Sequence, residues 1–147
     1  MNWRGPGLAL LLLCCSVLSV SARGDRVVLI VNAGGPATAL DAIDIKRLFL
    51  GIPVERSGIT LRSMVNNSDE RIKQVFLQYV VSMSETAYQR RLLMLALAQG
   101  RSMPPVYSDN AQLLAAVAAN SSAVSYAWES AALRNPRVRI LRELWHE

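Results

Sequence analysis

Cysteine and histidine are scarce in this sequence: the chain of 147 residues has two cysteines and one histidine. Both cysteines, Cys14 and Cys15, lie in an N-terminal segment that we expect to be removed. The mature chain would then have no disulfide, no thiol nucleophile and no thiolate metal site. His146 is the penultimate residue, in a tail that we expect to fray, and this position does not favour a Ser-His-Asp triad. We predict no metal site, no cofactor and no catalysis.

The sequence also lacks an apolar run of the length that a membrane-spanning helix needs. Its most apolar stretch, residues 8–20, is about a dozen residues long, whereas a spanning helix needs ~20. Arg4 precedes this stretch and the small residues of Val20-Ser21-Ala22 follow it, which is typical of a secretory signal peptide. We therefore expect cleavage after Ala22 and a single domain over residues 23–147, the alternative being an uncleaved anchor. Export of a cysteine-free mature chain fits a bacterial periplasm.

Long runs of one charge are absent as well. Lysine and arginine number 16 against 11 acidic residues, a formal net charge of +5. Without Arg4 the balance is fifteen basic to eleven acidic residues. The basic residues are scattered and few aromatic residues lie between them, so the pattern does not favour nucleic-acid binding. The charge indicates no more than a modest preference for anionic ligands or surfaces.

The most informative segment that is present, residues 40–51, has every feature of a short helix. Asp41 can cap the first turn, and Asp44 adds a negative charge near the positive end of the helix dipole. Gly51 provides a left-handed stop, and Pro53 prevents the helix from resuming. The segment follows an apolar run at residues 27–31 and a loop of small residues at 32–38, which together predict strand, loop and helix.

The remaining elements alternate between the two periodicities. We expect strands at residues 60–65, 123–128 and 138–141. A polar turn, Asn66-Asn67-Ser68-Asp69, is expected to open a helix that runs to Val80, and two further helices are expected from Ser84 to Gly100 and from Asp109 to Ala119. Residues 100–105, which include Pro104-Pro105, are expected to form a stiff loop. Strands separated by helices favour an α/β layer fold. The side chains expected to meet in the core are Ile45, Leu48, Phe49, Val75, Phe76, Tyr79 and Val117.

In this order, the segments resemble the phosphate ABC-transporter substrate-binding proteins, which have the type 2 periplasmic-binding-protein fold. The matching stretches are residues 27–31, the helix that ends in Leu48-Phe49-Leu50-Gly51, residues 68–79, Gly100-Arg101 leading to Pro104-Pro105, and residues 117–126. The resemblance covers nearly all of the mature chain. It implies about one lobe of the usual two: a small lobe with a central mixed sheet and helices packed on both faces.

The chain departs from the family pattern at the helix that holds phosphate. Family members commonly begin this helix with Gly-Ser-Gly-Thr or a close variant, where this chain has Asn67-Ser68-Asp69-Glu70. The tryptophan usual before the Gly58 turn and the one usual in the third helix are also absent. The resemblance therefore supports the fold more strongly than it supports phosphate binding.

Two segments are candidate parts of a ligand site. At the start of the second helix, free backbone N–H groups, Asn67 and the Ser68 hydroxyl could hold an oxyanion, with Arg71 or Arg62 giving a charge-assisted bond. The loop containing Gly34, Gly35 and Thr38 is the second segment, because loops after strands line the crevice of α/β sheets. Arg101 is expected to support the site. In the alternative interpretation Ser68 and Asp69 only cap a helix, Arg71 is a solvated surface residue and the glycine loop is an ordinary turn.

Two classes of function remain open. The first is a periplasmic solute-binding module for phosphate or another small oxyanion, which the resemblance favours. The second is a non-catalytic periplasmic interaction protein that keeps the fold and has lost the ligand, as the Asp69 and Glu70 carboxylates would favour. A single lobe leaves a ligand half exposed, so a partner protein or a second copy in a homodimer could complete the cleft.

Overall fold

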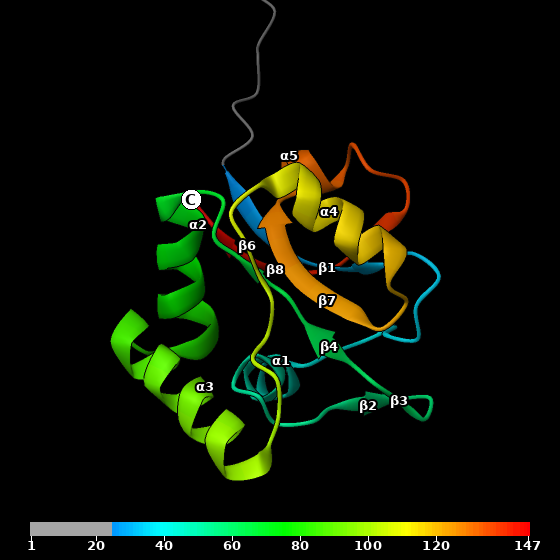
Figure 1. Cartoon of the computed structure of the whole chain (residues 1–147). Coiled ribbons are helices and arrows are strands. Elements are labelled where there is room, and N and C mark those ends of the chain that lie inside the picture. The colour runs from blue at the N-terminus through cyan, green and yellow to red at the C-terminus, as the bar shows by residue number, and fades with distance from the viewer. Residues whose placement is uncertain (1–24) are drawn as a thin grey trace, which may run out of the picture.

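The computed structural model describes residues 25–147, and the expected signal peptide lies outside these residues. Its centre is a four-stranded mixed sheet (Figure 1) with the order β4 (Arg62–Ser63), β7 (Ala123–Trp128), β1 (Arg26–Asn32) and β8 (Val138–His146). Strand β1 is antiparallel to both β7 and β8, whereas β4 is parallel to β7. Two short ladders flank the sheet: β2 (Glu55–Arg56) pairs with β3 (Ile59–Thr60), and β5 (Val65–Asn66) pairs with β6 (Val106–Tyr107).

Helices cover both faces of the sheet, as the sequence predicted. Alternate residues of β1 enter two separate cores, because successive side chains of a strand point to opposite faces. Val27, Leu29 and Val31 pack in the core formed with α1 (Ala42–Phe49), α2 (Glu70–Val75), the π-helical segment η1 (Phe76–Val81) and α3 (Glu85–Gln99). Val28 and Ile30 pack in the core formed with α4 (Asn110–Ala119) and α5 (Glu129–Ala132). Burial on both faces explains why β1 is a continuous apolar run.

The larger core is built around four aromatic rings. Phe76 stacks on Tyr126 with 4.5 Å between ring centroids and 4° between planes, and Phe49 meets Phe76 edge-on at 5.2 Å. The Tyr88 hydroxyl donates to Phe49 O at 2.9 Å, and the Tyr126 hydroxyl donates to Asn66 O at 3.1 Å. Burial raises the pKa of both tyrosines, since a phenolate in this core would lose its hydration.

Local signals place several helix ends where the sequence predicted them. Asp41 caps α1, its Oδ1 accepting the Asp44 N–H at 2.7 Å, and Asp109 caps α4, its Oδ1 accepting the Gln112 N–H at 2.8 Å. Gly51 and Gly100 have φ angles of +80° and +61°, the left-handed backbone that ends α1 and α3. Among the described residues, no helix combines the length and the apolarity needed to cross a bilayer.

The prediction of one continuous strand at residues 60–65 is wrong. The structure divides this stretch among β3, β4 and β5, which pair with β2, β7 and β6 respectively. Each piece finds a different partner from a distant or neighbouring part of the chain, so no single ladder runs through the segment. An alternating pattern indicates extended backbone but carries no information about which strand it joins.

Two core predictions are also wrong. Tyr79 is 54% exposed, because the π-helical segment has a wider turn than an α-helix and the buried side is taken by Phe76, Leu77, Val80 and Val81. Val117 is fully buried, but it packs with Val28 and Ile30 on the opposite face of the sheet from Phe76.

The prediction that the C-terminal tail frays is wrong, because the tail forms part of β8. This strand extends to His146, which pairs with Arg26 at the start of β1, and the Glu147 N–H donates to Asp25 O at 3.1 Å. Two register shifts in the β1–β8 pairing bulge this edge strand. Bulges twist an edge and disfavour pairing with another chain.

Candidate functional site

One end of the sheet gathers Asp69, Arg71, Trp128 and Trp145, and we call it the Arg71 edge. The parallel strands β4 and β7 run toward this end, and β5 leads from β4 into α2. Ligands of open α/β sheets bind outside the carboxyl ends of the strands. By this rule the Arg71 edge is a candidate ligand site.

The start of α2 is already occupied by a carboxylate. Asp69 is the N-cap residue: its Oδ1 accepts the Ile72 N–H at 2.8 Å, and its Oδ2 accepts the indole N–H of Trp128 at 2.8 Å. The Ser68 N–H donates to Asn66 Oδ1 at 3.0 Å, so Ser68 precedes the cap and is not the cap itself. An external oxyanion would have to compete with Asp69 for the helix start.

Arg71 is neutralised by residues from both ends of the described chain. Its guanidinium forms ion pairs with Asp25, at 3.2 Å, and with Glu147. It also lies 5.7 Å from the Trp128 ring centroid and 5.5 Å from that of Trp145, which is cation–π distance. The hydrogen bond that Arg71 donates to the Glu147 carboxylate raises the pKa of Arg71. With the Asp69 carboxylate beside this single guanidinium, the Arg71 edge is poorly suited to a phosphate dianion.

The loop with Gly34, Gly35 and Thr38 lies at the opposite end of β1. The seven residues of β1 separate the loop from the Arg71 edge by roughly 20 Å, at about 3.3 Å per residue. A Cβ on Gly35 would lie 2.2 Å from Ser121 O, so this glycine permits close packing of two backbone segments. The Asn32 side chain fastens the same loop, donating to the carbonyls of Val117 and Ala118 at 3.0 and 2.8 Å.

Arg62 and Arg101 come together at a third place. They line one open cavity of about 240 Å³, with Arg62 contributed by β4 and Arg101 by the segment after α3. Thr60, Ser63 and Ser102 also line it, and no carboxylate does. Arg101 Nη1 donates to Gly51 O at 3.3 Å, and within the described residues neither guanidinium forms an ion pair.

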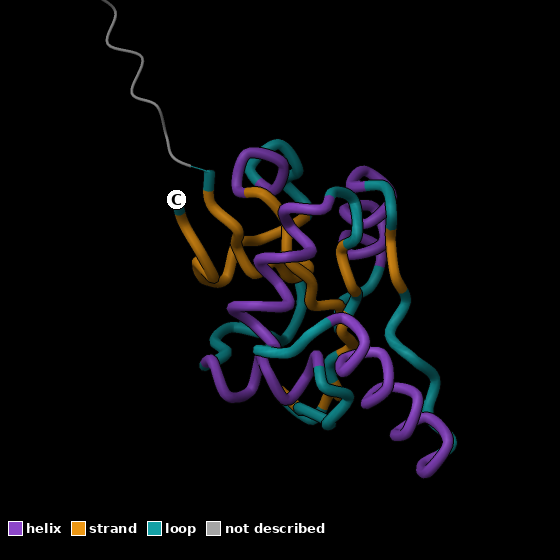
Figure 2. The backbone as a smooth tube through the Cα atoms, turned by 90° about the vertical axis from the view of Figure 1, so that its left-hand side faces the viewer, coloured by secondary structure: helices purple, strands orange, loops and turns teal. Residues whose placement is uncertain are grey.

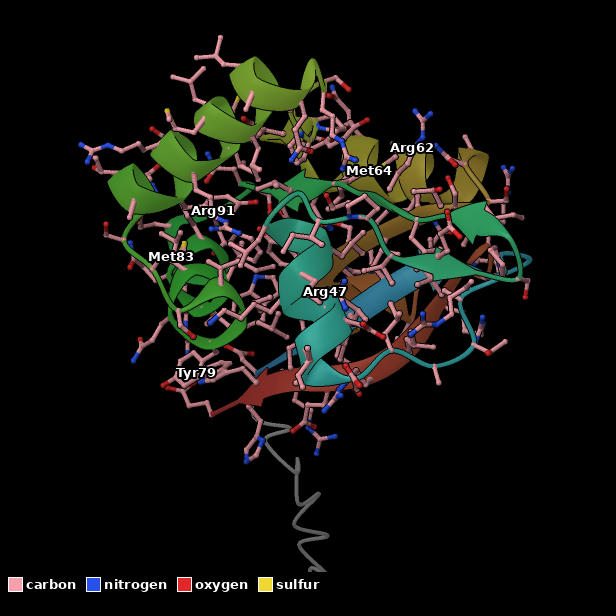
Figure 3. The ribbon with its side chains drawn as sticks, turned by 90° about the horizontal axis from the view of Figure 1, so that it is seen from below. Arg47, Arg62, Met64, Tyr79, Met83 and Arg91 are labelled. Carbon is pink, nitrogen blue, oxygen red and sulfur yellow. The ribbon has the colours of Figure 1, made fainter. Side chains whose placement is uncertain are left out.

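The candidate residues are therefore distributed over separate locations. Ser68 and Arg71 lie at the Arg71 edge, the glycine loop at the other end of β1, and Arg62 with Arg101 at their own cavity. Figure 3 shows the separation. Tyr79 lies beside the arrowhead of β8, and its ring centroid is 6.3 Å from that of Trp145, which belongs to the Arg71 edge. Arg62 lies at the opposite corner of the same view. Asn67 lines a different, more apolar groove.

Sequence reasoning missed the two tryptophans of the Arg71 edge and the hydroxyls beside Arg62. Trp128 ends a predicted strand, at the position where strands of α/β folds meet ligands, and this position was a usable signal. Thr60 and Ser63 flank Arg62 in a segment expected to be extended. In residues 25–147, no three His, Cys, Asp or Glu side chains are grouped so that they could hold a metal ion.

The similarity of this chain to known proteins lies in its structure and not in its sequence. No protein-family model matches the chain, and no curated protein matches its sequence. A solved structure of an ABC-type phosphate transport receptor from Vibrio cholerae is similar over 81% of this chain, with a TM-score of 0.59 and 14% identity. PstS from Borrelia burgdorferi is similar over 82%, with a TM-score of 0.61 and 12% identity. A putative phosphate ABC transporter substrate-binding protein from Clostridium perfringens, with bound phosphate, is similar over 85%, with a TM-score of 0.56 and 12% identity.

The fold is therefore of the periplasmic-binding-protein class, as the sequence predicted. More particularly, it is the fold of about one lobe of the phosphate ABC-transporter substrate-binding proteins. The chain spans about half the length of these proteins, from 46% to 57% of the three chains above. At 12–14% sequence identity the similarity shows the fold alone and does not identify a ligand.

Proposed function

We propose that this lobe binds phosphate or another small oxyanion, and that it does so at the Arg62–Arg101 cavity. The observation that supports this most is the lining, which includes two arginines and three hydroxyl-bearing residues beside ten apolar residues, and no carboxylate. Charge-assisted hydrogen bonds from arginine to an oxyanion are about twice as strong as neutral ones. The phosphate-binding proteins of the same fold support an oxyanion as the ligand class.

The electrostatic contrast with the Arg71 edge favours this cavity. At the Arg71 edge the carboxylates Asp25, Asp69 and Glu147 surround one guanidinium, whereas Arg62 and Arg101 have no acidic neighbour in the cavity lining. An anion that binds beside Arg62 or Arg101 gains attraction without displacing a carboxylate. Arg101 is also oriented by its bond to Gly51 O, which lowers the entropy lost on binding.

The proposed module works without catalysis and in the periplasm, where the predicted signal peptide would deliver it. The cavity is open to solvent, and binding sites for small molecules usually bury most of the ligand. A protein partner, a permease of an ABC transporter or a second copy of the chain would complete the enclosure. The solute-binding role in transport is thus proposed for the assembly and not for the lobe alone.

Calorimetry of the purified protein with phosphate, sulfate and acetate tests the proposal. We expect saturable heat with at least one of these anions. Arg62→Gln and Arg101→Gln should each weaken binding by about tenfold or more, since a hydrogen bond to a charged group contributes roughly 1.5–3 kcal/mol. The matched control is Arg71→Gln, which removes an exposed guanidinium at the other end of the sheet and should leave the affinity unchanged. Loss of binding in Arg71→Gln alone would move the site to the Arg71 edge.

The second candidate function is a periplasmic interaction protein without a solute ligand. The position of Asp69 favours it, because a carboxylate fills the anion-binding start of α2 and is fastened there by Trp128. Tryptophan and arginine, which meet at this edge, are also the residues that dominate protein interfaces. Absence of any heat with millimolar phosphate, sulfate and acetate would favour this function over oxyanion binding.

A further inference from the structure

Exposed apolar side chains gather on and after α3. Nine large apolar or aromatic side chains of the described residues are exposed, and five of them lie between residues 93 and 106. These five are Leu93, Met94, Leu97, Met103 and Val106, and we call them the α3 surface. Their exposed fractions run from 46% at Met103 to 74% at Leu97. Concentrated apolar exposure of this kind marks interaction sites, whereas isolated exposed residues are ordinary.

The geometry of α3 explains why these side chains are left in solvent. Of its 15 residues only Tyr88 and Leu92 are buried, and the helix lies at the margin of the molecule with most of its circumference free (Figures 1 and 2). Arg90, Leu93, Met94 and Leu97 are spaced at i, i+3, i+4 and i+7. This spacing forms a stripe along one side of a helix and is typical of a helix–helix contact.

The stripe borders a groove of about 560 Å³. Phe76, Tyr88 and Leu92 line the groove as buried residues, and Leu93, Met103 and Val106 line it as exposed ones. Walls from α3 and from the segment containing Met103, Pro104 and Val106 make it concave. A rod-shaped segment can enter such a groove, whereas a flat bilayer cannot follow its walls.

Lys73, Glu85 and Arg90 line the groove, and Lys73 pairs with Glu85 at 3.2 Å. The charge that remains beside the α3 surface is positive. From residue 86 to residue 108 the chain has three arginines and no acidic residue. Within the described residues, Arg90, Arg91 and Arg101 form no ion pair. A second copy docked through the same surface would bring arginines against arginines. A partner with carboxylates beside its apolar residues would be complementary.

We propose that the α3 surface docks an amphipathic helix of a partner protein whose apolar stripe is flanked by Asp or Glu. The apolar stripe of the partner lies along Leu93 and Leu97 and enters the groove beside Met103 and Val106. Its carboxylates face Arg90, which lines the groove. This is the helix-in-groove mode of recognition, in which apolar anchors give affinity and charge gives orientation and selectivity.

A pair of designed peptides tests the proposal on the whole purified protein. Each is a fluorescein-labelled amphipathic helix of about 16 residues, or ~24 Å, with leucine at i, i+3, i+4 and i+7. The flanking positions are glutamate in one peptide and lysine in the other. By fluorescence anisotropy we expect the glutamate peptide to bind, with a Kd at least about tenfold lower than the lysine peptide. No binding by either peptide, or equal binding by both, would overturn the proposal.

Variants locate the contact. Leu93→Gln and Val106→Gln change exposed side chains, so the fold should be retained, and each should weaken binding of the glutamate peptide by about tenfold. Leu133→Gln, at a leucine that is 63% exposed just after α5, is the matched control and should leave binding unchanged. Arg62 lines the proposed oxyanion cavity and not the groove, so Arg62→Gln should not alter peptide affinity, which separates the two proposals.

Two further measurements can overturn the choice of partner. Co-sedimentation with phosphatidylglycerol vesicles that is lost in Leu93→Gln would assign the surface to an anionic membrane. Self-association in sedimentation velocity that is lost in Leu93→Gln would assign it to a second copy of the chain. A monomer that stays free of the vesicles and binds the glutamate peptide is the result that the proposal requires.

Discussion

The indole N–H of Trp128 donates to Asp69 Oδ2 at 2.8 Å, joining the end of β7 to the start of α2. The same carboxylate caps the helix through the Ile72 N–H. One acidic side chain therefore orders a helix start, orients a tryptophan and occupies the positive end of the α2 dipole. The start of α2 thus carries a negative charge of its own, in a fold shared with phosphate-binding proteins.

Replacing Asp69 by alanine should destabilise the protein by about 1–2 kcal/mol, because the cap and the bond to Trp128 are both lost. Urea unfolding measures the change. Asp109→Ala removes the N-cap of α4, which has no tryptophan partner, and should cost about 1 kcal/mol. Equal losses in the two variants would show that the Trp128 bond adds nothing to stability.

Phe76→Ala should cost about 3–5 kcal/mol of unfolding free energy, because the ring is buried and contacts three other aromatic rings. Tyr79→Ala, three residues further along the same helical segment, is the matched control. Tyr79 is exposed, so its loss should be less than about 1 kcal/mol. Similar losses for both residues would contradict the outward position of Tyr79.

Gly35→Ala should destabilise the protein by about 1–3 kcal/mol, since the new methyl group would meet Ser121 O and the two backbone segments would have to separate. Gly34→Ala is the adjacent control: its Cβ would lie 3.6 Å from Asn32 Oδ1, an ordinary contact. Thermal unfolding compares the two. A Gly35→Ala protein as stable as the wild type would show that this loop is not tightly packed.

Stability should fall as the pH rises above about 10. Burial raises the pKa of Tyr88 and Tyr126 in the folded state above the ordinary value of 10.0, so between the unfolded and folded values the native protein holds more protons. Unfolding then becomes more favourable with increasing pH. Urea melts from pH 8 to pH 11 should show this slope, and Tyr88→Phe should reduce it.

The signal peptide stays a prediction of the sequence. Intact-mass measurement on protein from a periplasmic extract should give a chain that begins at Arg23. Ala22→Arg, which places a large charged residue at the cleavage position, should reduce processing. Recovery of the full-length chain from the membrane fraction of wild-type cells would contradict cleavage.

Short-range chemistry made much of the fold predictable. Neighbouring residues are enough to define features that act within one turn or one strand. These features include the cap at Asp41, the left-handed glycines Gly51 and Gly100 and the apolar run of β1. The α/β class follows from the alternation of two periodicities. The resemblance in the order of segments identified the fold class that the solved structures share.

Long-range contacts decided what the sequence left open. The segment at residues 60–65 divides among three strands because its partners come from residues 55–56, 106–107 and 123–124. The sequence proposed Arg71 for anion binding but could not show that Asp25 and Glu147, 46 and 76 residues away, pair with it in the fold. Arg62 and Arg101 meet at one cavity only because α3 returns the chain to β4. Periodicity and capping determine the helices and strands. Strand pairing, side-chain burial and the groups that lie beside each charged side chain depend on three-dimensional packing.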